Sequence, residues 1–382
     1  MTGVAILGST GSIGRQALEV IDALGDRFRV VAIAAGHPGT AFRAQLGQWP
    51  EARAWCPGER PEGVAPHRWA AGGLAELSTL PDAELVVVAT TGMAALPAVL
   101  AALRAGRRVA LANKETLVTG GHLVTAALDE LGGDPLERVR PIDSEHSAIW
   151  QCLVGEPIGA VARLVLTASG GPFRDLEPID LVDVTPAQAL AHPTWRMGPK
   201  ITIDSATLVN KAFEVIEAKW LYRLPYSKID AVIHPQSVAH SFVEFADGSY
   251  KAQLGLPDMR LPIQYALTYP DRVPSRSRAS SPEDWGALTF APLREGAFPA
   301  YDAVRRAADA GGNRGTILNA ADEMAVAAFL EGRIRFPAIA ETIERAVDRW
   351  GSDDEPTLDD VERLDAEVRA GLATQLGARA GS

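Results

Sequence analysis

Val4-Ala5-Ile6-Leu7-Gly8-Ser9-Thr10-Gly11-Ser12-Ile13-Gly14 is the stretch that decides the fold of the first part of the chain. Its four leading apolar residues predict a short buried strand, and the glycines, spaced G-x-x-G-x-x-G, predict a tight turn into a helix over 13–24. Glycines at this place let backbone N–H groups approach a pyrophosphate, which the positive end of the helix also attracts. We therefore predict a dinucleotide site, with a tight turn that binds nothing as the alternative.

The following residues alternate short apolar runs with helical patterns. Further strands are expected at Arg29–Ala35, Leu85–Thr90 and Val109–Ala112. This alternation predicts an α/β domain with a parallel, doubly wound (Rossmann-like) sheet, whose ligands lie at the carboxyl ends of the strands.

The pattern changes after about residue 145. Arg163–Ala168 predicts a strand, and residues 228–254 predict a strand followed by a hairpin around Asp247-Gly248, which together indicate an α+β domain with a mixed or antiparallel sheet. Residues 270–293 are expected to form a linker, because this stretch begins with many Pro, Ser and Arg residues. Residues 300–382 carry only helical patterns. A helical domain is expected to end the chain.

Bulk composition narrows the class of protein. The chain has 382 residues, 47% hydrophobic and 22% charged, which is typical of a soluble globular protein of two or three domains. Its net charge of −11 argues against a general nucleic-acid binder. Two cysteines form no disulfide framework and no zinc spacing, and the chain opens on a core strand rather than a secretory signal. The uncharged residues 85–103 are better explained as strand, turn and helix than as a membrane span, so we expect a cytoplasmic protein.

The end of the second expected strand bears on the choice of nucleotide. An acidic side chain there would bind the ribose 2′-hydroxyl of NAD, but the sequence reads Ala34-Ala35-Gly36-His37-Pro38. His37 and Arg43 are nearby cationic side chains, and this favours NADP.

Asp143-Ser144-Glu145 offers two carboxylates to a hard divalent cation, which prefers oxygen ligands. In an extended segment, residues i and i+2 point the same way, so both carboxylates are expected to face one ion. An isolated acidic triplet is more often a solvated turn, and it is the neighbouring motifs that favour the metal.

Two further polar motifs are candidates for substrate binding. Asn113-Lys114-Glu115 follows an expected strand and could orient a nicotinamide ribose and neutralise an oxyanion, or could be a solvated helix start. Ser205 is expected at the start of a helix that carries Asn210, Lys211 and Glu214 on one face. Hydroxyl, amide and ammonium groups suit a phosphate monoester, with Glu214 able to reach a metal; the alternative is a surface Lys–Glu pair.

His192-Pro-Thr-Trp195-Arg-Met197-Gly198-Pro199 has neither helical nor strand periodicity. Prolines and a glycine around a Trp and a Met are typical of a lid that folds over a ligand. A long loop whose Trp fills the core is the alternative.

Taken together, these motifs closely resemble the 1-deoxy-D-xylulose 5-phosphate reductoisomerase family. The matching stretches occur in the family's order: GSTGSIG (8–14), NKE (113–115), PIDSEHSAIWQC (141–152), ASGGPF (168–173), HPTWRMG (192–198), DSATLVNKAFE (204–214), HPQS (234–237) and GTILNAADE (315–323). The resemblance implies an enzyme of non-mevalonate isoprenoid synthesis. Such an enzyme isomerises and reduces 1-deoxy-D-xylulose 5-phosphate to 2-C-methyl-D-erythritol 4-phosphate, using NADPH and Mn²⁺ or Mg²⁺, as a homodimer.

The resemblance also implies roles for single residues. The metal ligands would be Asp143, Glu145 and Glu214. Contacts with the sugar phosphate would come from Lys114, Ser144, Glu145, Ser169, His192, Trp195, Ser205, Asn210, Lys211 and Glu214. NADPH contacts would come from Thr10, Gly11, Ser12, Ile13, Gly36, Asn113, Glu115, Met197 and Gly198. Lys114 and Glu145 are the candidates for proton transfer.

The expected domains follow from the same resemblance. They are an NADPH-binding domain (1–143), a catalytic and dimerisation domain (144–269) with a flap at 191–200, a linker (270–293) and a helical domain (294–382). Three features differ from family members: His37-Pro38 replaces a basic residue and asparagine, and Arg196 and Pro199 lie in the flap. A metal-dependent NADP dehydrogenase without rearrangement and an inactive NADPH-binding sensor remain the alternatives. A phosphorylating semialdehyde dehydrogenase is disfavoured because neither cysteine lies in a recognisable nucleophile setting.

Overall fold

The computed structural model describes residues 1–192 and 197–377, which form two compact units. The first unit contains residues 1–116, 123–150 and 258–279, and the second contains residues 117–122, 151–257 and 280–382. The chain therefore leaves the first unit and returns to it. The four expected domains divide the chain differently from these units and stay a prediction.

The first unit is built on a parallel six-stranded sheet with the order β3-β2-β1-β4-β5-β6. Its strands are β1 (Thr2–Leu7), β2 (Phe28–Ala34), β3 (Arg53–Trp55), β4 (Leu85–Val88), β5 (Arg108–Leu111) and β6 (Val139–Pro141). This is the strand order of dinucleotide-binding domains, in which ligands bind where the order reverses, beside the first strand. Val4 to Leu7 are fully buried because helices cover both faces of such a sheet.

Helices of the first unit follow its strands and cover the sheet. They are α1 (Ser12–Leu24), α2 (Thr40–Gln48), α3 (Gly73–Ser78), α4 (Leu96–Arg104), α5 (Glu115–Leu131), α6 (Pro135–Arg138), α7 (Ser144–Leu153) and α11 (Arg260–Thr268); part of α5 and the end of α7 belong to the second unit. β4, a short turn and α4 confirm strand–turn–helix for residues 85–103. No helix among the described residues is long and apolar enough to cross a membrane.

The second unit holds a mixed five-stranded sheet with the order β10-β9-β7-β8-β11. Its strands are β7 (Val161–Ala168), β8 (Ile229–Ile233), β9 (Ala239–Phe245), β10 (Tyr250–Leu254) and β11 (Ala291–Pro292). β7 and β8 are parallel, and the other pairs are antiparallel. The mixed sheet and the hairpin around Asp247-Gly248 were both expected from the sequence and are confirmed.

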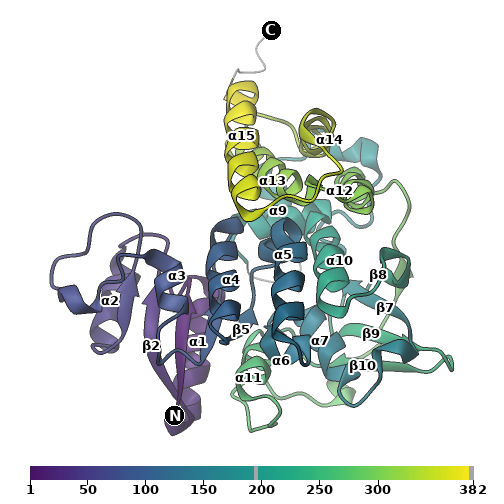
Figure 1. Ribbon diagram of the computed structural model, residues 1–382. Coiled ribbons are helices and arrows are strands. Elements are labelled where there is room, and N and C mark those ends of the chain that lie inside the picture. Colours follow the sequence, from purple (N-terminus) through teal and green to yellow (C-terminus); the bar gives the residue numbers. More distant parts are fainter. Residues whose placement is uncertain (193–196, 378–382) are drawn as a thin grey trace. The chain divides into compact units, whose positions relative to one another are not determined.

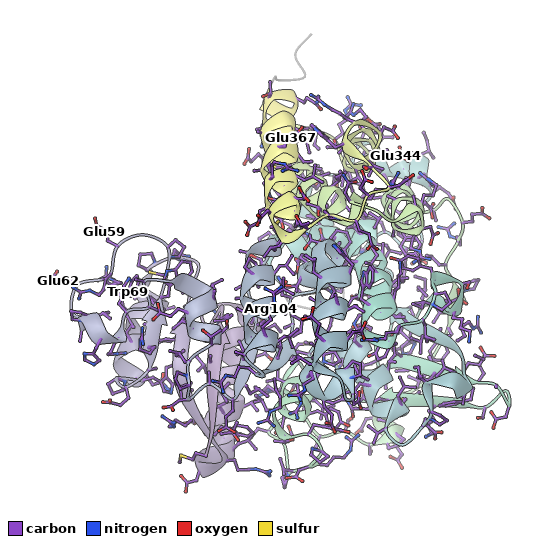
Figure 2. All side chains as sticks on the ribbon, in the orientation of Figure 1. Glu59, Glu62, Trp69, Arg104, Glu344 and Glu367 are labelled. Carbon is purple, nitrogen blue, oxygen red and sulfur yellow. The ribbon has the colours of Figure 1, made fainter. Side chains whose placement is uncertain are left out.

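Helices make up the rest of the second unit. They are α8 (Pro186–Ala189), α9 (Pro199–Thr207), α10 (Val209–Tyr222), α12 (Pro299–Ala310), α13 (Arg314–Leu330), α14 (Ala338–Trp350) and α15 (Leu358–Gly377). The last four form one bundle, drawn in green to yellow (Figure 1). One apolar core joins this bundle to α9 and α10 through residues such as Ile203, Phe213 and Ile317. Acidic side chains such as Glu344 and Glu367 lie on the outer surface of the bundle (Figure 2).

Short 3₁₀ turns connect several of these elements. They are Gly25–Arg27, Pro66–Arg68 and Met93–Ala95 in the first unit, and Ile158–Ala160, Pro178–Leu181, Tyr226–Lys228 and Pro282–Asp284 in the second.

Two local expectations are wrong. Asp143, Ser144 and Glu145 are not an extended segment: Asp143 immediately precedes α7, and Ser144 and Glu145 form the first turn of this helix. Ser205 is not at the start of the helix that carries Asn210 to Glu214 but in the last turn of the preceding helix, α9. Leu208, in the left-handed conformation with φ of 58°, separates α9 from α10.

Candidate active site

The glycine-rich turn between β1 and α1 is held in a shape that only glycine permits at two positions. Gly8 has φ of +93°, and a side chain there would meet the backbone of Ala89 at 2.4 Å. A Cβ on Gly14 would lie 2.2 Å from the carbonyl oxygen of Gly8. Gly11, in contrast, has φ of −68°, and its nearest contact for a Cβ would be 3.4 Å away. Gly8 and Gly14 are therefore required by the turn itself, whereas Gly11 is not.

The same turn exposes a helix N-terminus. Gly11 and Ser12 are exposed, Thr10 and Ile13 are half-buried, and within the described part of the chain no side chain caps α1 at Gly11. Uncapped N–H groups and the helix dipole together suit a phosphate. Gly36, at the end of the neighbouring strand β2, is also exposed, with no described atom within 4 Å of a Cβ built there.

A buried pair of hydrogen bonds between Ser9 and Gln45 stabilises the turn. The sequence did not indicate this contact. The Ser9 hydroxyl donates to Oε1 of Gln45 at 2.6 Å, and Nε2 of Gln45 donates to the Ser9 carbonyl at 2.9 Å. Both side chains are buried, so this pair ties α2 to the turn.

Asn113 is fully buried after β5, and its side-chain amide is completely engaged. Nδ2 donates to the carbonyls of Thr90 and Gly92, both at 2.9 Å, and Oδ1 accepts from the backbone N–H and the hydroxyl of Thr116. All four hydrogen bonds of this amide are made, so the side chain has none left for a nucleotide. Any hydrogen bond between Asn113 and a nucleotide would therefore use the main chain of Asn113. The side chain joins the loop after β4 to the start of α5, where Glu115 is the first residue.

Lys114 and the acidic pair of the first unit lie together. Nζ of Lys114 is 2.5 Å from a carboxylate oxygen of Asp143, and the Lys114 side chain is almost fully buried. The backbone N–H of Ser144 donates to Asp143, and the Ser144 hydroxyl donates to Glu145 at 2.6 Å. Oxygen atoms of Asp143 and Glu145 lie within 4.8 Å of each other, so two hard ligands are available to one divalent cation.

In the second unit, the His192 imidazole lies within hydrogen-bond distance of two serine hydroxyl groups. Its Nε2 is 3.2 Å from the Ser169 hydroxyl and 3.0 Å from the Ser205 hydroxyl. Burial lowers the pKa of His192, so the imidazole is neutral at neutral pH. The loop after β7 can pass this close to α9 only because residue 171 is glycine: a Cβ there would lie 2.6 Å from the Ser205 carbonyl oxygen.

Asn210, Lys211 and Glu214 meet on α10, as their spacing predicted. Nδ2 of Asn210 donates to Glu214 at 2.5 Å, and the Lys211 ammonium forms an ion pair with the other oxygen of this carboxylate. Lys211 and Glu214 are 3% and 1% exposed, which excludes the alternative of a solvated surface pair. A buried ammonium beside an amide is suited to binding an anion.

The remaining predicted residues lie around α9. Met197 is half-buried and Gly198 is exposed, directly before this helix. Trp195 lies outside the described residues, as does Arg196. The predicted ligands are thus divided by sequence between the units: Asp143 and Glu145 belong to the first, and Glu214 to the second.

Three family models together match most of the chain. The model of 1-deoxy-D-xylulose 5-phosphate reductoisomerase matches residues 4–121, the model of its C-terminal domain matches residues 139–222, and a further model of a DXP reductoisomerase C-terminal domain matches residues 254–371. The chain belongs to the 1-deoxy-D-xylulose 5-phosphate reductoisomerase family. The resemblance seen in the motifs is confirmed.

Curated relatives extend this match over the full length. The reductoisomerase of Pelotomaculum thermopropionicum is 45% identical over 379 residues, covering 97% of each chain. That of Geobacillus kaustophilus is 48% identical over 382 residues, covering 96% of this chain and 97% of its own.

Solved structures of reductoisomerases share the fold. A DOX-P reductoisomerase in complex with NADPH, fosmidomycin and magnesium has a TM-score of 0.90 and 34% identity, covering 99% of this chain and 98% of its own. The reductoisomerase of Zymomonas mobilis in complex with NADPH has a TM-score of 0.87 and 36% identity, covering 98% of this chain and 99% of its own. The α/β fold class expected from the sequence is confirmed.

Proposed function

We propose that the protein converts 1-deoxy-D-xylulose 5-phosphate to 2-C-methyl-D-erythritol 4-phosphate in non-mevalonate isoprenoid synthesis, as an oxidoreductase dependent on NADPH and on Mg²⁺ or Mn²⁺. The observation that carries this proposal is the full-length match to reductoisomerases, among them one bound to NADPH, fosmidomycin and magnesium. The acids, hydroxyls and lysines expected of such a site are all retained by this chain.

Each group of side chains has a part in this proposal. Asp143, Glu145 and Glu214 would hold the divalent cation, and their hard oxygen donors fit magnesium or manganese. When bound, the cation would supply Lewis-acid stabilisation of negative charge on the substrate, and NADPH would supply hydride. Lys114, paired with Asp143, can neutralise charge or deliver a proton beside these acids.

The phosphate would bind to the second unit. Ser169 and Ser205 present hydroxyl groups that His192 orients, and Lys211 with Asn210 adds an ammonium and an amide. The Lys211 ammonium, already paired with Glu214, would then bridge the phosphate and a metal-binding acid. Binding energy from the phosphate can in this way organise the reacting end of the sugar.

The decisive experiment follows NADPH oxidation by absorbance with 1-deoxy-D-xylulose 5-phosphate and Mn²⁺ or Mg²⁺, with a chelator as control. Metal-dependent oxidation that yields the branched polyol phosphate supports the proposal. A linear polyol phosphate would instead identify a dehydrogenase without rearrangement. NADPH binding without any oxidation would identify a sensor.

Lys211→Ala is expected to raise KM for 1-deoxy-D-xylulose 5-phosphate by about 30-fold, because a buried ammonium that contacts phosphate is lost. Steady-state kinetics with the phosphorylated and the dephosphorylated sugar check this. An equal loss with both sugars would remove the phosphate role of Lys211.

Arg43→Ala is expected to raise KM for NADPH about fivefold and to leave KM for NADH unchanged, because an exposed cation contributes roughly 1 kcal/mol to binding a phosphate. Arg43 lies on α2 and its Nε donates to the carbonyl of Pro38, so it reaches the loop where NAD enzymes carry an acid. Arg104→Ala removes another exposed positive charge from the same unit and is the control. Equal effects of Arg43→Ala on both nucleotides would contradict this role.

We further propose that the protein works as a cytoplasmic homodimer, as the family resemblance implies. Sedimentation or light scattering of the purified chain tests the dimer: a mass near 81 kDa, twice 40.6 kDa, supports it, and 40.6 kDa contradicts it.

A further inference from the structure

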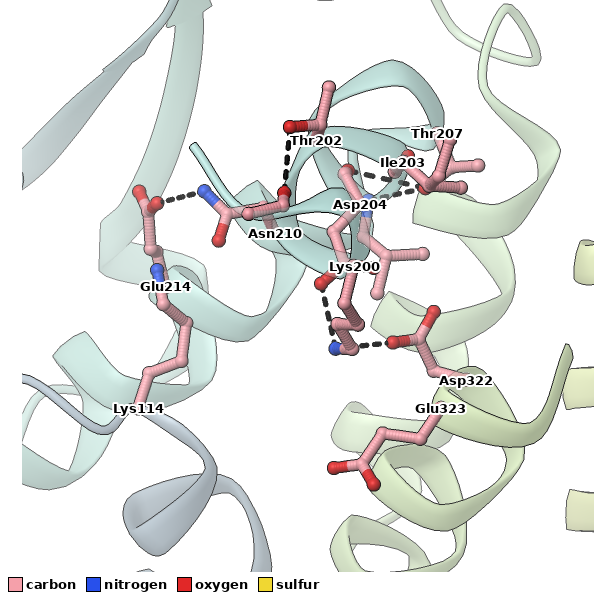
Figure 3. Close-up of polar contacts among 12 residues, drawn as sticks. Lys114, Lys200, Thr202, Ile203, Asp204, Thr207, Asn210, Glu214, Asp322 and Glu323 are labelled. Carbon is pink, nitrogen blue, oxygen red and sulfur yellow. Dashed lines mark hydrogen bonds and ion pairs between the residues drawn. The ribbon is translucent and has the colours of Figure 1, made fainter. Parts of the chain in front are cut away.

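A buried ionic cluster in the second unit contains none of the proposed metal, substrate or NADPH ligands, although Lys200 is the last residue of the expected flap. Nζ of Lys200 is 2.7 Å from a carboxylate oxygen of Asp204 and 2.6 Å from one of Asp322 (Figure 3). Asp204 is 3% exposed and Asp322 is fully buried, whereas the Lys200 side chain is 30% exposed. Two buried carboxylates thus share one ammonium that reaches them from the surface.

The cluster joins three helices. Lys200 and Asp204 lie one turn apart on α9, and Asp322 lies on α13 of the C-terminal bundle. The Lys200 ammonium also lies 5.3 Å from the ring centroid of Phe213 on α10, within range of a cation–π interaction. One ammonium therefore contacts α9, α10 and α13 together.

Two of these helices carry the proposed phosphate ligands. Ser205 directly follows Asp204 on α9, and Phe213 stands between Lys211 and Glu214 on α10. α9 and α10 are separate helices, because the chain turns at Leu208. Their relative position is therefore not fixed as it would be within one continuous helix. The apolar core already packs both helices together. The Lys200 ammonium adds a directional polar contact between them, close to the Ser205 hydroxyl and the Lys211 ammonium in sequence.

We propose that Lys200, held by Asp204 and Asp322, is a positioning residue that aligns α9 and α10 on α13 so that Ser205, Asn210 and Lys211 bind one phosphate. This inference rests on the proposed function and assigns a role to the GTILNAADE motif of the bundle, to which Asp322 belongs. The C-terminal bundle then contributes to substrate affinity without contacting the substrate.

Calorimetry on the full chain with Mg²⁺ tests the inference, with 1-deoxy-D-xylulose 5-phosphate as probe and its dephosphorylated form as reference. Lys200→Met is expected to weaken binding of the phosphorylated sugar about tenfold and to leave binding of the reference sugar within about twofold. In kinetics, KM should rise more than kcat falls. Lys200→Arg, which keeps a cation between the two carboxylates, should restore affinity to near that of the wild type.

Glu323→Gln is the matched control. Glu323 is next to Asp322 but pairs with Arg369 on α15, so its substitution perturbs the bundle and spares α9. If Lys200→Met does not fold, Asp322→Asn is measured in its place with the same two sugars. This variant leaves Lys200 paired with Asp204 and removes only its contact with α13. It should weaken binding about threefold.

Unchanged affinity in folded Lys200→Met or Asp322→Asn would overturn the inference, as would an equal loss in Glu323→Gln. A wild-type chain that binds neither sugar would instead overturn the proposed function, so the two failures are distinguishable.

Discussion

Glu214→Gln is expected to lower turnover about 10²- to 10³-fold, while the dissociation constant for NADPH changes by less than about twofold. Glutamine keeps the size of Glu214 but removes the negative charge that a divalent cation requires. The nucleotide turn belongs to the other unit, so its affinity should be spared. Turnover measured across a Mg²⁺ or Mn²⁺ titration, together with NADPH binding by fluorescence, checks both halves of this expectation.

The substitution also removes the partner of a buried ammonium, because Lys211 pairs with Glu214. Thermal unfolding must therefore accompany the kinetics, since an unpaired buried charge destabilises a fold. Glu244→Gln is a suitable control: it breaks the salt bridge between Glu244 on β9 and Arg163 on β7, in the same unit. Unchanged turnover of a folded Glu214→Gln at saturating metal would refute the assignment of Glu214 as a metal ligand.

Gly14→Ala is expected to destabilise the first unit by roughly 3 kcal/mol and to abolish NADPH binding. The added methyl group would meet the Gly8 carbonyl oxygen at 2.2 Å and Cα of Ser9 at 2.7 Å. These are backbone atoms, which cannot rotate away as a side chain could. Urea unfolding followed by tryptophan fluorescence measures the loss.

Gly11→Ala separates nucleotide binding from folding in the same turn. Its methyl group fits the described protein atoms without a close contact, so unfolding should stay near that of the wild type. NADPH affinity should nevertheless fall about tenfold or more, because the methyl group occupies the space through which a pyrophosphate approaches the backbone. Wild-type affinity in Gly11→Ala would exclude this turn as the pyrophosphate site.

The sequence was sufficient for four of the six strands in the first unit, β1, β2, β4 and β5, and for the side chains that meet on α10. Continuous apolar strands, the glycine spacing and the i, i+4 spacing of Asn210 and Glu214 are local signals, and local signals are what a sequence pattern carries. The three-residue strands β3 and β6 were missed, since so short a segment shows no periodicity.

Other errors have different physical causes. The break at Leu208 could not be anticipated, because leucine rarely adopts a left-handed conformation and does so here only in its tertiary setting. The helix that begins at Ser144 was predictable in principle: an acid before Ser-Glu is typical of a helix N-terminus. The Lys200–Asp322 contact joins residues far apart in the chain, which no single sequence pattern can indicate.

The return of residues 258–279 to the first unit has a consequence for how the protein is made. α11 packs on α1, the ring of Tyr265 lies 4.7 Å from that of Trp150, and Arg140 donates to the carbonyl of Ala266 at 2.8 Å. During synthesis, the six strands leave the ribosome well before this helix does, by a delay on the order of ten seconds. Until then, the apolar residues of the first unit that share a core with α11, among them Ile21 and Trp150, lack this cover. A truncated chain that stops near residue 150 is therefore expected to bind chaperones or aggregate rather than to survive as an independent nucleotide-binding fragment.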